Sequence, residues 1–327
     1  MAHTPFVPLR VLSSFSMLEG AIDPKGIAKL AKERGFPAIA MTDRNGLYGA
    51  MAFASACKDT GIQPLLGATL GVQRERGGPI DWLVLLVQDE TGWNNLCRLV
   101  SRAHLDRPLE LDAHVTIDDL AGSSDGLIAL TGAGDGALAR LLAEDRTEAA
   151  ADYCNRLEGL FPGRLYIEIA RRNDPVEEAA EDALIALAYA RDLPLVATNP
   201  AQYGEPHFHA AHDALLCIAN STHIDAADRP RSARDSWVKS APMMAELFAD
   251  LPEALANTLV VAQRCAFAPP KRKPLLPSLA GDKDGEALML AEHARAGLER
   301  RLEPYGEMAE EDRRAYFEDR KSTRLNS

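Results

Sequence analysis

Short runs of Val, Ile and Leu alternate with longer segments of helical period from the N-terminus to about residue 220. This alternation is typical of β-α units and predicts a parallel sheet. Strands are expected at residues 9–12, 38–42, 64–72, 82–87, 126–130, 164–169 and 193–198. Helices are expected between them, at residues 24–34, 46–59, 92–103, 137–160, 175–191 and 208–220. The pattern indicates the α/β class and a barrel of alternating strands and helices.

Polar residues follow several of the predicted strands, just before the next helix. Asp43, Asp89, Glu168 and Asn199 stand at these places. In a β/α barrel the carboxyl ends of the strands open on one face, so these side chains are expected to share a site there. For Asp43, Asp89 and Asn199 an alternative stays open, because Asp and Asn also cap helices.

The pattern changes after the last predicted strand. Two further helices are expected before the first domain, residues 1–268, comes to its end. Residues 269–277 are rich in proline and basic side chains, which predicts a linker. A charged helix at residues 286–301 begins a further region, residues 278–320, that the chain is not expected to complete. Residues 321–327 break the periodicity and are interpreted as a non-native tail.

Composition narrows the class of protein. With 327 residues, of which 46% are hydrophobic and 26% charged, the chain is long enough to bury a full core. The formal net charge of -12 argues against this segment binding nucleic acid by itself, because phosphate binding needs a basic surface. We find neither a membrane-spanning pattern nor a secretory signal, and we expect a cytoplasmic protein. The cysteines are widely spaced, which predicts buried, reduced thiols at Cys57, Cys97, Cys154, Cys217 and Cys265.

Two local clusters suggest chemistry by their composition. His207, His209 and His212 stand close together, and the last two are one helical turn apart, so they form a candidate metal cluster. The alternative is that they are helical neighbours without any ligand role. The glycine-rich stretch at residues 132–136 follows a predicted strand and is either a phosphate-binding loop or a plain turn, because it lacks the rest of a nucleotide-binding fingerprint.

A colinear series of short segments carries a resemblance over nearly all of residues 5–270. The segments are FVPLRVLSSFSMLEGA at 6–21, AMTDRNGLYG at 40–49, GIQPLLG at 61–67, ETGWNNL at 90–96, LVATN at 195–199, AHDALLCI at 211–218 and ELFADLPEALANT at 246–258. This series resembles the polymerase-and-histidinol-phosphatase (PHP) domain of bacterial DNA polymerase III alpha subunits. The resemblance implies that residues 1–268 form a PHP-type distorted seven-stranded β/α barrel, and that residues 278–320 are the truncated start of the polymerase palm region.

The metal-binding positions of that family have changed in this sequence. Its histidines and carboxylates correspond here to Arg10, Leu12, Arg44, Thr69, Trp82, Arg172, Pro200 and Gln202, and of the family's positions only Glu19 keeps a ligand type. Arginine offers hydrogen-bond donors only, and Leu, Trp and Pro side chains offer no ligand atom, so no intact metal site is expected. Instead, the three arginines are expected to pair with Glu19, Asp43 and Glu168.

The resemblance favours one function over two alternatives. It implies the N-terminal scaffold of the replicative DNA-directed DNA polymerase III alpha subunit, without catalytic residues or a cofactor in this segment and with Mg²⁺ bound by the missing palm domain. The implied partners are the proofreading exonuclease subunit, other polymerase III holoenzyme subunits, and primer-template DNA through the downstream domains, and no membrane. The alternatives are a free-standing PHP-family metal-dependent phosphoesterase or 3'-5' exonuclease, and a stand-alone interaction module.

Overall fold

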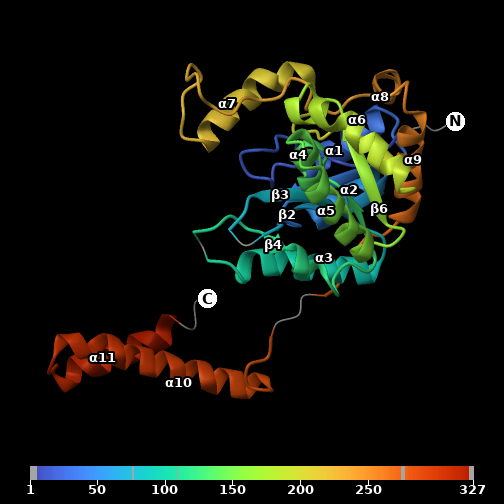
Figure 1. Ribbon diagram of the computed structural model, residues 1–327. Coiled ribbons are helices and arrows are strands. Elements are labelled where there is room, and N and C mark those ends of the chain that lie inside the picture. Colours follow the sequence, from blue (N-terminus) through green and yellow to red (C-terminus); the bar gives the residue numbers. More distant parts are fainter. Residues whose placement is uncertain (1–5, 76, 109, 274–276, 324–327) are drawn as a thin grey trace. The chain divides into compact units, whose positions relative to one another are not determined.

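A computed structural model of the protein describes residues 6–75, 77–108, 110–273 and 277–323 (Figure 1). The chain forms two compact units, Met1–Pro269 and Pro270–Ser327. None of the described helices combines the length and the apolar character needed to cross a bilayer.

A curled sheet forms the centre of the first unit. Its strands are β1 (Ala38–Arg44), β2 (Gln63–Gln73), β3 (Ile80–Val87), β5 (Leu127–Leu130), β6 (Leu165–Ala170) and β7 (Leu195–Thr198), adjacent in that order, and β4 (Val115–Thr116) pairs with β2. β3 is antiparallel to both of its neighbours, so the prediction of a wholly parallel sheet is wrong. The connection from Gln73 to Ile80 is too short for a crossover helix, and the chain must therefore return in the opposite direction.

The segment around residues 8–12, which was predicted to be the first strand, joins the two edges of the sheet. On one side, the backbone N–H groups of Ala40 and Thr42 in β1 donate to the carbonyls of Pro8 and Val11, at 2.8 and 2.9 Å. On the other side, Leu12 N–H donates to the Ala201 carbonyl at 2.9 Å. The extended segment thereby closes the curled sheet into a distorted β/α barrel, as expected.

Helices surround the barrel at most of the predicted places. They are α1 (Pro24–Glu33), α2 (Ala50–Thr60), α3 (Glu90–Leu105), α6 (Pro175–Ala190), α7 (His209–Ala219), α8 (Ala241–Leu247) and α9 (Pro252–Arg264). Asp23, Asp89 and Asp174 cap α1, α3 and α6 by accepting hydrogen bonds from the first backbone N–H groups. The short helices η1 (Ile117–Leu120), η2 (Ala133–Asp135) and η3 (Pro206–Phe208) lie in the connections.

One predicted helix, at residues 137–160, is in fact two. α4 (Ala137–Ala143) and α5 (Thr147–Leu160) are separated by a turn in which Asp145 has φ of 57°. Asp tolerates this left-handed conformation better than most residues, and Arg146 N–H closes the turn on the Leu141 carbonyl at 2.9 Å.

Two apolar clusters fill the first unit. Strand side chains point alternately to the two faces of the sheet. One set packs between the sheet and the surrounding helices, as Ile39 and Leu66 do. The other set, which includes Leu65 and Leu86, fills the barrel and is joined by Val261 of α9. Four of the cysteines are buried, Cys97 is half-buried, and all are free thiols.

The second unit is helical. α10 (Lys283–Leu302) contains the predicted charged helix, and η4 (Glu303–Tyr305) and α11 (Glu310–Thr323) follow it. α10 has no buried residue. The helix α11 continues through residues 321–323, which were predicted to break the pattern, and residues 324–327 lie outside the described part of the chain.

Candidate functional site at the barrel mouth

The strand ends place most of the predicted polar residues at one mouth of the barrel. Asp43 lies at the carboxyl end of β1, Glu168 lies in β6, and Asn199 follows β7. Asp89 does not belong to this group. It follows the antiparallel β3 and therefore lies at the end of the barrel opposite the mouth. There it accepts a hydrogen bond from Gly92 N–H at 2.9 Å as the cap of α3, so the capping alternative is correct for this residue.

Glu168 is the central carboxylate of the mouth, and it is fully buried. Arg10 Nη1 lies 3.1 Å from Glu168 Oε1, so one of the three arginines pairs with this carboxylate, as expected. Thr198 Oγ1 donates to the same oxygen at 2.5 Å, and Gly132 N–H donates to Oε2 at 2.9 Å. Both carboxylate oxygens are thus engaged by hydrogen-bond donors of the protein itself.

The glycine-rich turn at residues 132–136 is built against this pair. Gly132 has φ of 91°, and a methyl group on it would lie 2.1 Å from the Trp82 carbonyl oxygen. Only glycine fits such a conformation and such a close approach. Gly132 N–H donates to Glu168, and the Gly132 carbonyl accepts from Arg10 at 3.2 Å. These backbone groups of the turn thus bind side chains of the protein itself.

Asp43 is held by serines, and the expectation that an arginine pairs with it is wrong. Ser13 donates to it through both its backbone N–H and its hydroxyl, and the Ser16 hydroxyl donates as well, each at 2.7 Å. The loop after the closing segment passes directly over the end of β1 and brings these serines there. Asp43 is buried and caps no helix.

Arg44 pairs with Glu19, as expected, through a short contact from its Nε. Its guanidinium carbon lies 4.1 Å from the centroid of the Trp82 ring. Trp82 can reach this place because β3 runs antiparallel, so the start of β3 lies beside the end of β2 at the mouth. A cation-π contact thus holds the arginine plane in a fixed orientation.

Arg172 has partners that the sequence did not indicate. Its Nε donates to Glu177 Oε1 at 2.8 Å, and its backbone N–H donates to Glu177 Oε2 at 3.0 Å. Its Nη2 also lies 3.9 Å from Asp135 Oδ2, and Arg10 lies 3.3 Å from the same oxygen. Burial alone would raise the pKa of Asp135, but the surrounding guanidinium groups, chiefly that of Arg172, hold it below its ordinary value.

Lys239 is a buried member of the mouth that sequence reasoning missed. Its Nζ donates to Asn199 Oδ1 at 2.8 Å and to the Asp235 carbonyl at 2.7 Å. Burial lowers the pKa of the ammonium group, and the nearby Asp235 carboxylate opposes that shift. Lys239 lies in an irregular segment without hydrophobic periodicity, so no local pattern could have assigned it to the mouth.

The other candidate site residues make packing and backbone contacts; they are Leu12, Thr69, Pro200 and Gln202. Leu12 and Pro200 are buried, and Gln202 is half-buried with its backbone N–H bound to the Ser236 carbonyl at 2.8 Å. Thr69 Oγ1 donates to the Thr42 carbonyl at 2.9 Å.

The three neighbouring histidines do not converge on a common point. His212 is buried, its Nε2 donates to the Glu19 carbonyl at 2.7 Å, and its Nδ1 lies 2.7 Å from Ser232 Oγ. His209 Nε2 contacts the Ser232 carbonyl at 2.9 Å, while His207 is exposed. Among the residues that the structure describes, no group of three or more His, Cys, Asp or Glu side chains is arranged to hold a metal ion.

Two DNA polymerase III alpha subunits are similar to this chain in sequence. A DNA polymerase III subunit alpha of Caulobacter vibrioides is 43% identical over 305 residues, which cover 91% of this chain and 27% of that protein. The DNA polymerase III subunit alpha of Rickettsia bellii is 36% identical over 301 residues, which cover 92% of this chain and 26% of that protein. The chain thus spans about a quarter of the length of these relatives.

A solved structure and a family model complete the comparison. A Bifidobacterium adolescentis protein assigned as a metal-dependent phosphoesterase has a TM-score of 0.44 and 13% sequence identity, covering 59% of this chain and 86% of that one. The family model of the PHP domain matches residues 8–172, from the closing segment with Arg10 to Arg172 beyond β6. Since this match takes in half of the sequence, including Arg10, Arg44 and Glu168 of the barrel mouth, the chain belongs to the PHP domain family.

Proposed function

We propose that this chain is the N-terminal, non-catalytic scaffold domain of a replicative DNA polymerase III alpha subunit. The relatives of that name, of which the chain spans about a quarter, support the proposal. The observation that carries the non-catalytic role is that Arg10, Arg44 and Arg172 each bind a carboxylate in the barrel mouth. DNA-directed nucleotidyl transfer, and the Mg²⁺ that it requires, belong in this proposal to the downstream part of the full-length protein.

The donor chemistry of the mouth does not suit a divalent cation. Guanidinium nitrogens have no lone pair to offer a metal, and an arginine about 6 Å away would repel a divalent ion by roughly 5 kcal/mol at an effective dielectric constant of about 20. The oxygens of Glu168 and Asp43, which have the chemistry of ligands, are already engaged by Arg10, Gly132, Thr198 and two serines. The residues present therefore do not fit the metal of the family.

The same assignment includes partners and a location. We propose that the domain binds the proofreading exonuclease subunit and assembles with other polymerase III holoenzyme subunits in the cytoplasm. Primer-template DNA would be bound by the downstream domains, because this segment has a net charge of -12.

A primer-extension assay on two proteins tests the function. The polypeptide encoded by the complete reading frame is expected to extend a primer, whereas the 327-residue chain is expected to add no nucleotide. Lack of extension by the longer polypeptide would count against the polymerase assignment.

Elemental analysis of the 327-residue chain, dialysed without chelator, tests the non-catalytic role. No stoichiometric zinc, manganese or magnesium is expected, together with no hydrolysis of p-nitrophenyl phosphate or single-stranded DNA. One tightly held metal ion per chain, whose removal abolishes hydrolysis, would instead establish the phosphoesterase or exonuclease alternative.

A further inference from the structure

Two segments beside the barrel mouth expose large apolar side chains, which we call the apolar rim. The loop after the closing segment contributes Phe15, Met17 and Leu18, and the α7 region contributes Phe208, Ile218 and Ile224. Met17 is 81% exposed and Ile218 is 67% exposed. Single exposed apolar residues are ordinary, but a series of them on adjoining segments marks an interaction surface.

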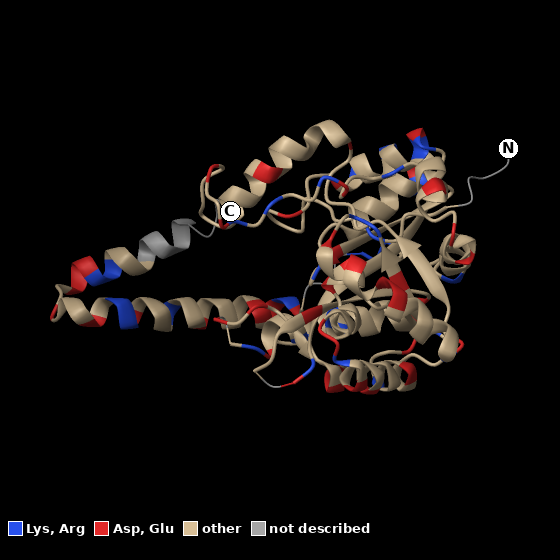
Figure 2. Ribbon diagram, turned by 45° about the horizontal axis from the view of Figure 1, so that its top comes forward, with Lys and Arg blue, Asp and Glu red and all other residues tan. Residues whose placement is uncertain are grey.

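The composition of α7 is unusual for a helix with so much exposed surface. Asp213 is its only Asp, Glu, Lys or Arg, and Figure 2 shows the helix tan over most of its length. Only His212 and Cys217 of α7 are buried. In Figure 1 the helix extends beyond the strands of the barrel. Its apolar residues are therefore largely without cover from the rest of the first unit, as the structure describes it.

The base of α7 is nevertheless firmly attached. Asp213 forms a two-pronged ion pair with Arg229, at 2.9 and 2.6 Å, and accepts from Ser232 N–H at 2.9 Å. His212 and His209 bind Ser232 from the same helix. These contacts tie the helix to the returning chain, so its exposed face has a fixed geometry before any partner arrives, which lowers the entropic cost of association.

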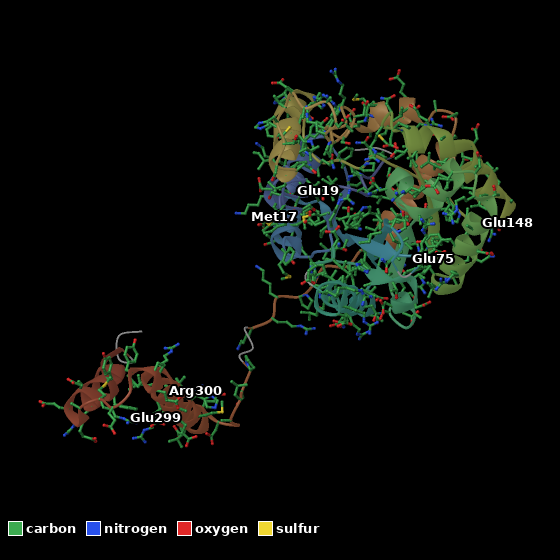
Figure 3. The ribbon with its side chains drawn as sticks, turned by 60° about the vertical axis from the view of Figure 1, so that its left-hand side comes forward. Met17, Glu19, Glu75, Glu148, Glu299 and Arg300 are labelled. Carbon is green, nitrogen blue, oxygen red and sulfur yellow. The ribbon has the colours of Figure 1, made fainter. Side chains whose placement is uncertain are left out.

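The two parts of the rim are joined through the barrel mouth. His212 Nε2 donates to the carbonyl of Glu19, and the Glu19 carboxylate pairs with Arg44. Figure 3 shows Met17 and Glu19 close together on their loop, beside the gold ribbon of α7. Arg44 thus helps to hold the loop that carries half of the rim.

We propose that the apolar rim is the docking surface for the downstream part of the same polypeptide. This inference rests on the proposed function, because it requires the longer protein of which the chain would be about a quarter. A pre-arranged face that is rich in apolar side chains is typical of a permanent interface, which is more hydrophobic than a transient one. A covalently linked partner is also present at high effective concentration, so it covers the face in every molecule.

Thiol labelling tests this surface in the intact proteins. Ile218→Cys and Met17→Cys are made in the 327-residue chain and in the polypeptide of the complete reading frame, and maleimide incorporation is followed by peptide mass spectrometry so that native cysteines do not interfere. Both thiols are expected to react at least about tenfold more slowly in the longer polypeptide. Leu105→Cys is the matched control, because Leu105 is apolar, 80% exposed and outside the rim, and its rate is expected to be unchanged.

The outcomes separate the docking surface from the function. Equal rates at position 218 in both proteins would overturn the inference, even if the longer polypeptide extends primers. Slow labelling in a longer polypeptide that does not extend primers would support docking while counting against the polymerase assignment. Concentration-dependent protection in the 327-residue chain, with a dimer in sedimentation, would identify a second copy as the occupant and would also overturn the inference.

Discussion

At the residue scale, ion pairs between buried side chains hold the barrel mouth together. Arg10 and Glu168 are both buried, and their pairing is reinforced by Thr198 and by the Gly132 N–H. A buried ion pair of this kind contributes little net stability, but removal of one partner leaves an uncompensated charge. The mouth therefore depends on each member being present.

Arg10→Met tests this dependence. The substitution keeps much of the side-chain volume but leaves the Glu168 carboxylate without its guanidinium partner. The free energy of unfolding measured in urea is therefore expected to fall by about 3–5 kcal/mol. Arg156→Met is the control, because Arg156 pairs with Asp118 in the open, and the loss there is expected to stay below about 1 kcal/mol. Adding Glu168→Gln to Arg10→Met should recover part of the stability, and the absence of any recovery would argue against the stranded charge.

His212 connects pH to stability at the base of α7. Burial, the largest cause, lowers its pKa below the ordinary value of 6.5, and the Glu19 carbonyl opposes that shift. As pH falls through about 6.5, His212 binds a proton in the unfolded chain but not yet in the folded chain. Protonation of His212 therefore favours unfolding in acid.

His212→Gln should therefore flatten the pH dependence of stability. The variant is expected to be less stable than the wild type at about pH 7.5, because it loses two well-placed hydrogen bonds. Its unfolding free energy should nevertheless fall less than that of the wild type between about pH 7.5 and 5.5. His223→Gln, at an exposed position, should keep the wild-type pH dependence. A His212 variant whose pH curve runs parallel to that of the wild type would contradict the argument.

At the element scale, the direction of β3 determines what reaches the mouth. Because β3 is antiparallel, its first residues lie at the mouth, and Trp82 can stack on Arg44. Because β3 runs in this direction, Asp89, which follows the last residue of β3, lies at the end of the barrel opposite the mouth. The turn around η2 then closes over Trp82, and the close approach of Gly132 to the Trp82 carbonyl fixes the turn against β3.

Gly132→Ala should disrupt this turn. The new methyl group would clash with the backbone oxygen of Trp82 in addition to forcing a residue with a side chain to adopt positive φ. Gly163→Ala is a matched control, because Gly163 also has positive φ, at 66°, but has no neighbour within 4 Å of the added carbon. The control is expected to lose about 1 kcal/mol, and Gly132→Ala at least about 2 kcal/mol more, in thermal or urea unfolding. Equal losses would show that the contact with β3 does not matter.

At the scale of the whole molecule, a barrel with its own core can act as a platform for other proteins. The strands, the surrounding helices and α9 enclose two apolar clusters, one between the sheet and the helices and one inside the barrel. In the proposed scaffold role, the ion pairs of Arg10, Arg44 and Arg172 hold the barrel mouth together.

Co-purification measures the proposed partner contact. The 327-residue chain is expected to retain the proofreading exonuclease subunit of the same organism, with a dissociation constant of about 10 μM or tighter, equivalent to roughly -7 kcal/mol. A folded protein of similar size and net charge serves as the control bait and should retain none. No detectable binding at tens of micromolar would count against this partner.

The sequence by itself determined most of the elements and their order. Apolar runs and the capping residues Asp23, Asp89 and Asp174 are local signals, and the helices that they start lie where they were expected. The motif series also predicted the family, because the order of short segments along the chain identifies a family without information on their contacts. The break between α4 and α5 was missed, since the single left-handed residue Asp145 interrupts an otherwise continuous apolar pattern.

Only the tertiary structure decided which charges meet. Arg10 and Glu168 are separated by 158 residues, and the order of strands around the barrel brings them together. Asp43 was expected to bind an arginine, but the path of the loop above it supplies serine hydroxyls instead. Lys239 reaches the mouth from an irregular segment that carries no periodic signal. The strength of a charge contact depends on distance and burial, and neither quantity is encoded in the spacing of residues along the chain.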